Sequence, residues 1–163
     1  MLAMPAAASA QQTFAASIDN AQVGASCLTG TGTGSGSFTL SGSDFDYNIL
    51  FSGMTGTETV SHVHGPAAPG SDAGVVFGLP LGSPKVGTQM ALTAGQIADL
   101  QAGLWYVNIH STLCAGGEIR GQILPDPHAI PVLGGSGFVA MAGLLLGTMF
   151  WMVRRRAQAG TAA

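Results

Sequence analysis

The stretch LWYVNIHSTLCAGGEIRGQIL, residues 104–124, decides the fold of this chain. Apolar and polar residues alternate from Trp105 to Ile109, and they alternate again from Ile119 to Ile123. This period of two predicts two half-buried strands, and the seven residues 111–117 between them predict the turn of a hairpin. In that register, apolar side chains face apolar ones and polar side chains face polar ones, whereas a one-residue slip would mix the two faces.

The polar face of this hairpin carries the first candidate site residues. The register predicts three cross-strand pairs, namely Tyr106 with Gln122, Asn108 with Arg120, and His110 with Glu118. The stretch VSHVHGPA, residues 60–67, adds His62 and His64, which share one strand face because residues two apart point the same way. If that strand lies beside the hairpin, we expect His62, His64, His110 and Glu118 to lie in one cluster.

Two interpretations of this cluster stay open. Buried polar groups need partners, so a structural network of hydrogen bonds is the first interpretation. Its members would be His62, His64, Asn108, His110, Glu118 and Arg120. Imidazole and carboxylate are also ligands that zinc and copper accept, so a metal site at His62, His64, His110 and Glu118 is the second. The structural interpretation is preferred at this point, with no cofactor and no catalytic residues.

The rest of the chain predicts an all-β fold. Charged residues make up only 8% of the 163 residues, and 25 are glycine, which favours short strands and many turns. We expect an antiparallel β-sandwich or barrel-like domain over residues 12–124. One short helix interrupts it at TAGQIADLQAG, residues 93–103, where Thr93 and Gln96 form a capping box and Gly103 suits the helix exit.

The C-terminal part predicts one membrane span. Residues 132–153, VLGGSGFVAMAGLLLGTMFWMV, contain no charge, and about 20 apolar residues suffice to cross a bilayer. Arg154, Arg155 and Arg156 follow at once, which favours a cytoplasmic C-terminus and a basic tail over residues 154–163. Residues 125–131, PDPHAIP, read as a linker between the outer domain and the span.

The N-terminal residues 1–10 have part of an export signal. Ala8-Ser9-Ala10 is similar to a signal-peptide cleavage site, but the basic region is missing and the apolar stretch is short. We therefore expect either that the true start lies upstream or that the sequence is a fragment. An ordinary alanine-rich N-terminus is the alternative.

Charge and cysteines agree with an exported domain. All eight acidic residues precede Pro131, with Lys85 and Arg120 as the basic residues there, which argues against nucleic acid as a partner. Cys27 and Cys114 lie in the same part and can persist as a disulfide outside the cytoplasm. Spacing alone leaves two free, buried thiols as the alternative.

Three blocks in this order resemble the CHRD domain, first described in chordin and common in bacterial secreted proteins. They are VSHVHGPAAPGSDAGVVFGL (60–79), LTAGQIADLQAGLWYVNIHST (92–112) and GGEIRGQI (116–123). The resemblance covers roughly residues 12–124. It implies a compact β-sandwich or barrel-like domain, and it implies no reaction. Chordin's growth-factor binding is not carried over, because a bacterial protein of this size is not expected to contain chordin's other modules.

The C-terminal segment resembles bacterial sorting tails, which combine a short motif, an apolar span and an arginine cluster. Ile130 and Pro131 in IPVLGGSG are similar to the IPTL-type tail, and Gly134 and Gly135 to the Gly-Gly type. The threonine and the usual Ser-Glu-Trp of the IPTL type are missing, so a permanent anchor stays open.

Together these patterns predict a non-enzymatic protein of the bacterial cell envelope. Its domain would be displayed outside a membrane crossed once, would pass through the secretion and tail-sorting machinery, and would bind an extracellular protein or matrix component. A zinc- or copper-binding protein, or a metal-dependent enzyme, is the alternative. The number of metal ligands that converge distinguishes the two.

Overall fold

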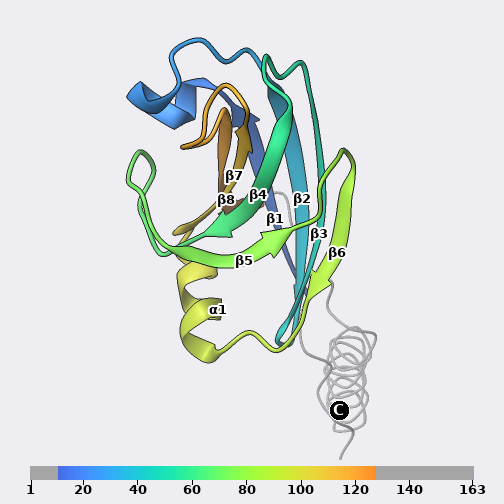
Figure 1. The fold of residues 1–163 in the computed structure, drawn as a ribbon. Helices are drawn as coiled ribbons and strands as arrows, with labels where there is room; N and C mark the ends of the chain where they lie inside the picture. Colours follow the sequence, from blue (N-terminus) through green and yellow to red (C-terminus); the bar gives the residue numbers. More distant parts are fainter. Residues whose placement is uncertain (1–10, 128–163) are drawn as a thin grey trace, which may run out of the picture. The chain divides into compact units, whose positions relative to one another are not determined.

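The computed structural model describes residues 11–127. Eight strands form one antiparallel sheet in the order β5-β4-β7-β8-β1-β2-β3-β6, and all pairings between neighbours are antiparallel. The strands are β1 (Gln12–Asp19), β2 (Thr33–Ser41), β3 (Asp44–Ser52), β4 (Glu58–His64), β5 (Val75–Leu79), β6 (Lys85–Gln89), β7 (Trp105–Ser111) and β8 (Ile119–Pro125). The sheet curls into a near-barrel, with β5 and β6 at its two edges (Figure 1).

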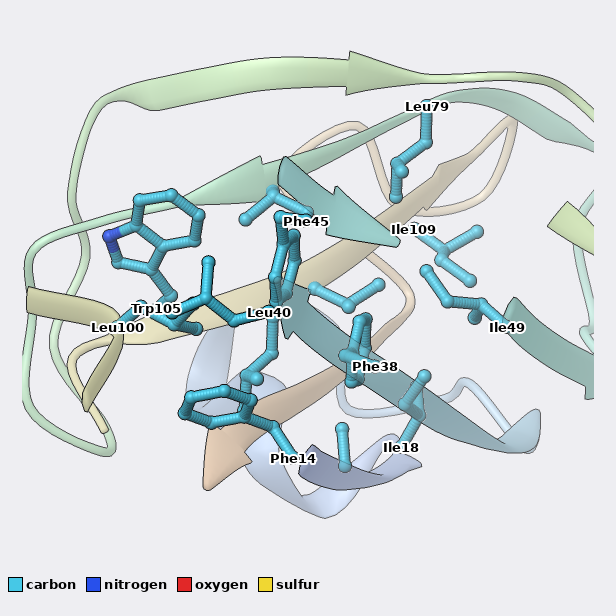
Figure 2. Close-up of a cluster of buried hydrophobic side chains, with 14 of the residues drawn as sticks. Phe14, Ile18, Phe38, Leu40, Phe45, Ile49, Leu79, Leu100, Trp105 and Ile109 are labelled. Atoms are coloured by element: carbon cyan, nitrogen blue, oxygen red, sulfur yellow. The ribbon is translucent and has the colours of Figure 1, made fainter. Parts of the chain in front are cut away.

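The concave face of the sheet encloses the hydrophobic core. Alternate residues of each strand point inward, as a half-buried sheet requires. Phe45 lies among the aromatic rings, with its centroid 5.4 Å from Phe38 and 5.8 Å from Trp105 (Figure 2). Because Phe45 belongs to β3 and Trp105 to β7, these contacts join opposite parts of the curled sheet.

A buried ion pair links the two ends of the sheet. Lys85 of the edge strand β6 is fully buried, and its ammonium donates to the carboxylate of Glu58 in β4 and to the carbonyl of Pro80. Glu58 also accepts from the hydroxyl of Ser61 and from the backbone N–H of Gly82. Burial raises the pKa of Glu58, but the hydrogen bonds from Lys85, Ser61 and Gly82 outweigh it and hold that pKa below its usual value.

The helical segments are short. The 3₁₀ helix η1 (Ala21–Ser26) follows β1, and α1 (Ala94–Gln101) precedes β7 at one end of the sheet (Figure 1). The predicted capping box is present, because Thr93 and Gln96 each accept from the other's backbone N–H. Gly103 has φ +70°, which confirms its predicted place at the helix exit.

The expectation of an all-β antiparallel fold with one short α-helix is confirmed. Neither helix within residues 11–127 has the length and apolar character that crossing a membrane requires. The predicted signal remnant 1–10, span 132–153 and basic tail 154–163 lie outside the described residues, as do most of the linker and all of the sorting-motif residues.

Candidate functional site

Three histidines lie together on the outer face of the sheet. His62 and His64 point outward from β4 on either side of Val63, which is fully buried. β4 pairs with β7, where His62 is opposite Asn108 and His110 is opposite Val60. The candidate ligand nitrogens of the three imidazoles all lie within 4.8 Å of one another. Within the part of the chain that the structure describes, this is the one such group of three.

Two backbone carbonyls fix the tautomers of two of these rings. His64 Nδ1 is 3.0 Å from the carbonyl oxygen of Ala73, and His110 Nδ1 is 2.8 Å from that of Ala115. A carbonyl oxygen can only accept, so each Nδ1 carries the proton and each Nε2 presents a lone pair. Histidine ligands in metal sites are commonly held by their second nitrogen in this way.

The lone pairs of the cluster have few partners. Nε2 of His64 is buried and has no hydrogen-bond partner within residues 11–127. Nε2 of His110 is 3.4 Å from Nδ1 of His62. Because the proton of His110 is on its Nδ1, its Nε2 accepts and Nδ1 of His62 donates. Two nitrogens bound to one tetrahedral zinc ion lie about 3.4 Å apart, given bonds of 2.0–2.1 Å. The His62–His110 separation therefore already suits a shared ion.

Two imidazoles of the cluster, those of His62 and His64, have a lowered pKa, which favours their neutral form. Burial lowers the pKa of His62, and the neighbouring His110 and His64 lower it further. Burial also lowers the pKa of His64; His110 and Arg120 act in the same direction, and the Ala73 hydrogen bond and Asp72 oppose it. Neutral imidazole is the form that binds metal ions.

Tyr106, Arg120 and the connection between β4 and β5 surround His64. The ring of Tyr106 stacks on His64 with centroids 5.1 Å apart, and its hydroxyl accepts from the N–H of Ala73 at 3.0 Å. The guanidinium of Arg120 lies 3.5 Å above the Tyr106 ring and donates to Asp72 and to the carbonyl of Ser71. Tyr106 therefore contacts His64 directly and also positions the backbone that orients it.

The predicted register of the last hairpin is confirmed for two of its three polar pairs. Tyr106 pairs with Gln122, and Asn108 pairs with Arg120. Asn108 lies among the cluster residues, where its amide nitrogen donates to the carbonyl of Gly116 at 3.0 Å. Arg120 lines the same cavity as His64, Asn108 and His110.

The prediction that Glu118 joins the histidines is wrong. The strand β8 begins at Ile119, so Glu118 is outside the regular alternation. Its side chain is fully buried and accepts from the backbone N–H groups of Thr55 and Gly56, in the connection between β3 and β4. Burial raises the pKa of Glu118, but hydrogen bonds from Ser111, Thr55 and Gly56 outweigh it and keep the pKa low. Glu118 therefore holds a loop in place and is no candidate ligand.

Cys27 and Cys114 form a disulfide, which confirms the first of the two alternatives. Their Cα atoms are 5.7 Å apart. The bond ties the segment after η1 to the turn of the last hairpin, whose Ala115 carbonyl orients His110. The disulfide thus lies next to a residue that sets the geometry of the cluster.

Sequence reasoning missed Tyr106, Asp72 and the two orienting carbonyls. Tyr106 shares the polar strand face of Asn108 and His110, which was the signal available for it. The carbonyl of Ala73 and the side chain of Asp72 belong to an irregular connection, and no periodicity places such residues.

A family comparison agrees with the order of motifs. The model of the CHRD domain matches residues 14–123, which include every strand described above except the last two residues of β8 and the first two of β1. No curated protein matches the chain, and no solved structure does. The match spans more than half of the 163 residues and contains all three histidines of the cluster. The chain therefore belongs to the CHRD domain family.

Proposed function

We propose that this chain is an exported, non-enzymatic CHRD protein that binds one transition-metal ion, zinc or copper, at His62, His64 and His110. The observation that carries the proposal is the convergence of three imidazoles in which His64 presents a buried, unpartnered Nε2. His62 would bind through Nδ1, and its proton would move to Nε2.

A purely structural network explains this arrangement less well. Such a network satisfies its buried groups, and a buried acceptor left without a partner costs about 1–3 kcal/mol. Here the carbonyls of Ala73 and Ala115 fix both Nδ1 protons, and Nε2 of His64 is left without a partner, while Nε2 of His110 has only Nδ1 of His62, at 3.4 Å. A metal ion would satisfy them. Three nitrogen ligands and no carboxylate suit zinc or copper better than magnesium or calcium, which prefer oxygen.

Export is the second part of the proposal. The Cys27–Cys114 disulfide supports it, since such bonds persist in oxidising compartments. We propose that the apolar residues 132–153 anchor the chain, with the arginines that follow on the cytoplasmic side and the CHRD domain outside. There the domain would hold metal at the envelope or present it to an extracellular partner.

The experiment is metal analysis of the full chain purified without a histidine tag. We expect close to one equivalent of zinc or copper to remain after dialysis, and a higher melting temperature with added metal. Stabilisation should be about 2.7 kcal/mol at a free metal concentration of a hundred times Kd.

Variants separate the cluster from other histidines. His64→Ala and His110→Ala should each abolish stoichiometric binding, whereas His128→Ala, in the linker, should leave it unchanged. His64→Ala also loses the Ala73 hydrogen bond and should destabilise the metal-free protein by about 1–3 kcal/mol. His110→Ala is the safer test because that side chain is partly exposed. Wild-type protein with no bound metal and no metal-dependent melting would refute the proposal.

A further inference from the structure

A cavity of about 190 Å³ adjoins the histidine cluster. His64 and His110 form part of its lining, together with Asn108, Asp72 and Arg120. His62 is not among the lining residues. An ion held by the three imidazoles would therefore have the cavity on the side of His64 and His110.

Three protein ligands leave one position of a tetrahedral ion open. Sites with three protein ligands commonly fill that position with water or with an exogenous ligand. The cavity is large enough for a small polyatomic anion as well as for water.

The positively charged side chain of Arg120 forms part of the cavity lining. Its side chain is only 5% exposed, so its charge is poorly screened by solvent. The one carboxylate paired with it in the described residues is Asp72, at 3.2 Å, and that side chain is 96% exposed. An exposed partner neutralises a buried guanidinium weakly, so an incoming anion can compete with Asp72.

We propose that the cavity binds a small anion, of the carboxylate or azide class, as the fourth metal ligand, with Arg120 as its second contact. This inference rests on the proposed metal site. A guanidinium presents several N–H donors in a plane that matches a carboxylate, which favours an anion over a neutral molecule. The ring of Tyr106 supports the guanidinium from below and keeps it in place.

The test uses the full chain loaded with Cu²⁺ and titrated with azide at constant ionic strength. Azide bound to copper gives a charge-transfer absorption band, which reports the anion separately from the metal. Metal content is measured on the same samples. We expect saturable azide binding to the wild-type protein.

One set of variants changes Arg120 itself, and another changes its ion-pair partner Asp72. Asp72→Asn removes the exposed competitor and should tighten azide binding about two- to fivefold. Arg120→Gln should weaken it about tenfold or more, and Arg120→Lys should restore part of the loss. Asp46→Asn, an exposed acid on β3, is the matched control and should leave azide affinity unchanged. Circular dichroism checks that each variant is folded.

The outcomes separate this inference from the function on which it rests. Copper binding without an azide band would overturn the anion site and leave the metal site standing. An azide affinity that is the same in the wild type, Asp72→Asn and Arg120→Gln would overturn the role of Arg120. No copper binding at all would overturn both proposals.

Discussion

Breaking the Cys27–Cys114 disulfide should weaken both the fold and the proposed metal site. The two cysteines are 87 residues apart in sequence, so the bond closes a long loop. Chain entropy gives about 4–5 kcal/mol for a loop of this length, and measured disulfides typically contribute about 2–4 kcal/mol. We expect the Cys27→Ser, Cys114→Ser double variant to lose about 2–4 kcal/mol of unfolding free energy.

The effect on metal binding follows from the position of Cys114. Its carbonyl accepts from the N–H groups of Ser111 and Gly117, and its own N–H donates to the Ser111 hydroxyl. The next residue, Ala115, supplies the carbonyl that fixes the tautomer of His110. Loss of a group that orients a metal ligand typically costs 10- to 100-fold in affinity. We therefore expect zinc affinity to fall about tenfold, the lower end of that range, because the turn keeps its other hydrogen bonds.

Urea denaturation of the metal-free protein and zinc titration of the folded protein measure the two effects separately. Reduction of the wild-type chain should reproduce both losses, and reduction of the double variant should change neither. Unchanged zinc affinity in a destabilised variant would show that the turn keeps its geometry without the disulfide. That result would refute the link between the disulfide and His110.

Three further predictions concern the fold and the topology. Glu58→Gln leaves a buried lysine without its carboxylate and should cost about 3 kcal/mol at neutral pH, since Glu58 is only 10% exposed. The pKa of Glu58 is lower in the folded protein than its ordinary value of about 4.5, so ionised Glu58 stabilises the fold above that pH. This contribution is lost as the pH falls, so the unfolding free energies of the wild type and the variant, measured by urea denaturation, should converge in acid. Gly117→Ala should lower the unfolding free energy of the domain by about 1–3 kcal/mol, because Gly117 has a φ of +118° that alanine rarely adopts. The added Cβ would also lie 2.1 Å from Asn108 Oδ1, which should increase the loss. An unchanged melting temperature would contradict this prediction. A reporter fused after Ala163 should behave as cytoplasmic and one inserted near Gly70 as external; the reverse would refute the predicted topology.

The parts of the fold that follow from local pattern could be predicted from the sequence. The register of the last hairpin is fixed because only one alignment buries Val107 and Ile109 together with Ile119 and Ile123. The helix is marked by its own capping box, which needs only residues three apart. The three histidines were found by the same parity argument, since strand alternation decides which face each side chain joins.

The interactions that were missed depend on where a regular strand stops or on residues far apart in sequence. Strand alternation does not place the side chain of Glu118, because Glu118 precedes the first residue of β8. Its carboxylate instead accepts hydrogen bonds from two backbone N–H groups in the connection between β3 and β4. No local sequence pattern predicts the ion pair between Glu58 and Lys85. The two residues belong to strands β4 and β6, which lie far apart in the sheet order and come together only because the sheet curls. Their contact depends on the curvature of the whole sheet.

The positions of the three histidines and the orientations of their rings are set by different parts of the fold. Strands β4 and β7 position the Cα atoms of all three histidines, and paired strands are the stiffest part of such a fold. The tautomers of His64 and His110 are set instead by Ala73 and Ala115, which lie in connections. The register between β4 and β5 shifts between Val63 and His64, where His64 pairs with Val75, next to the connection that carries Ala73. If the proposed metal site is correct, changes in these connections should alter metal affinity without changing which residues bind the ion, since they act on ring orientation and leave the strand positions intact.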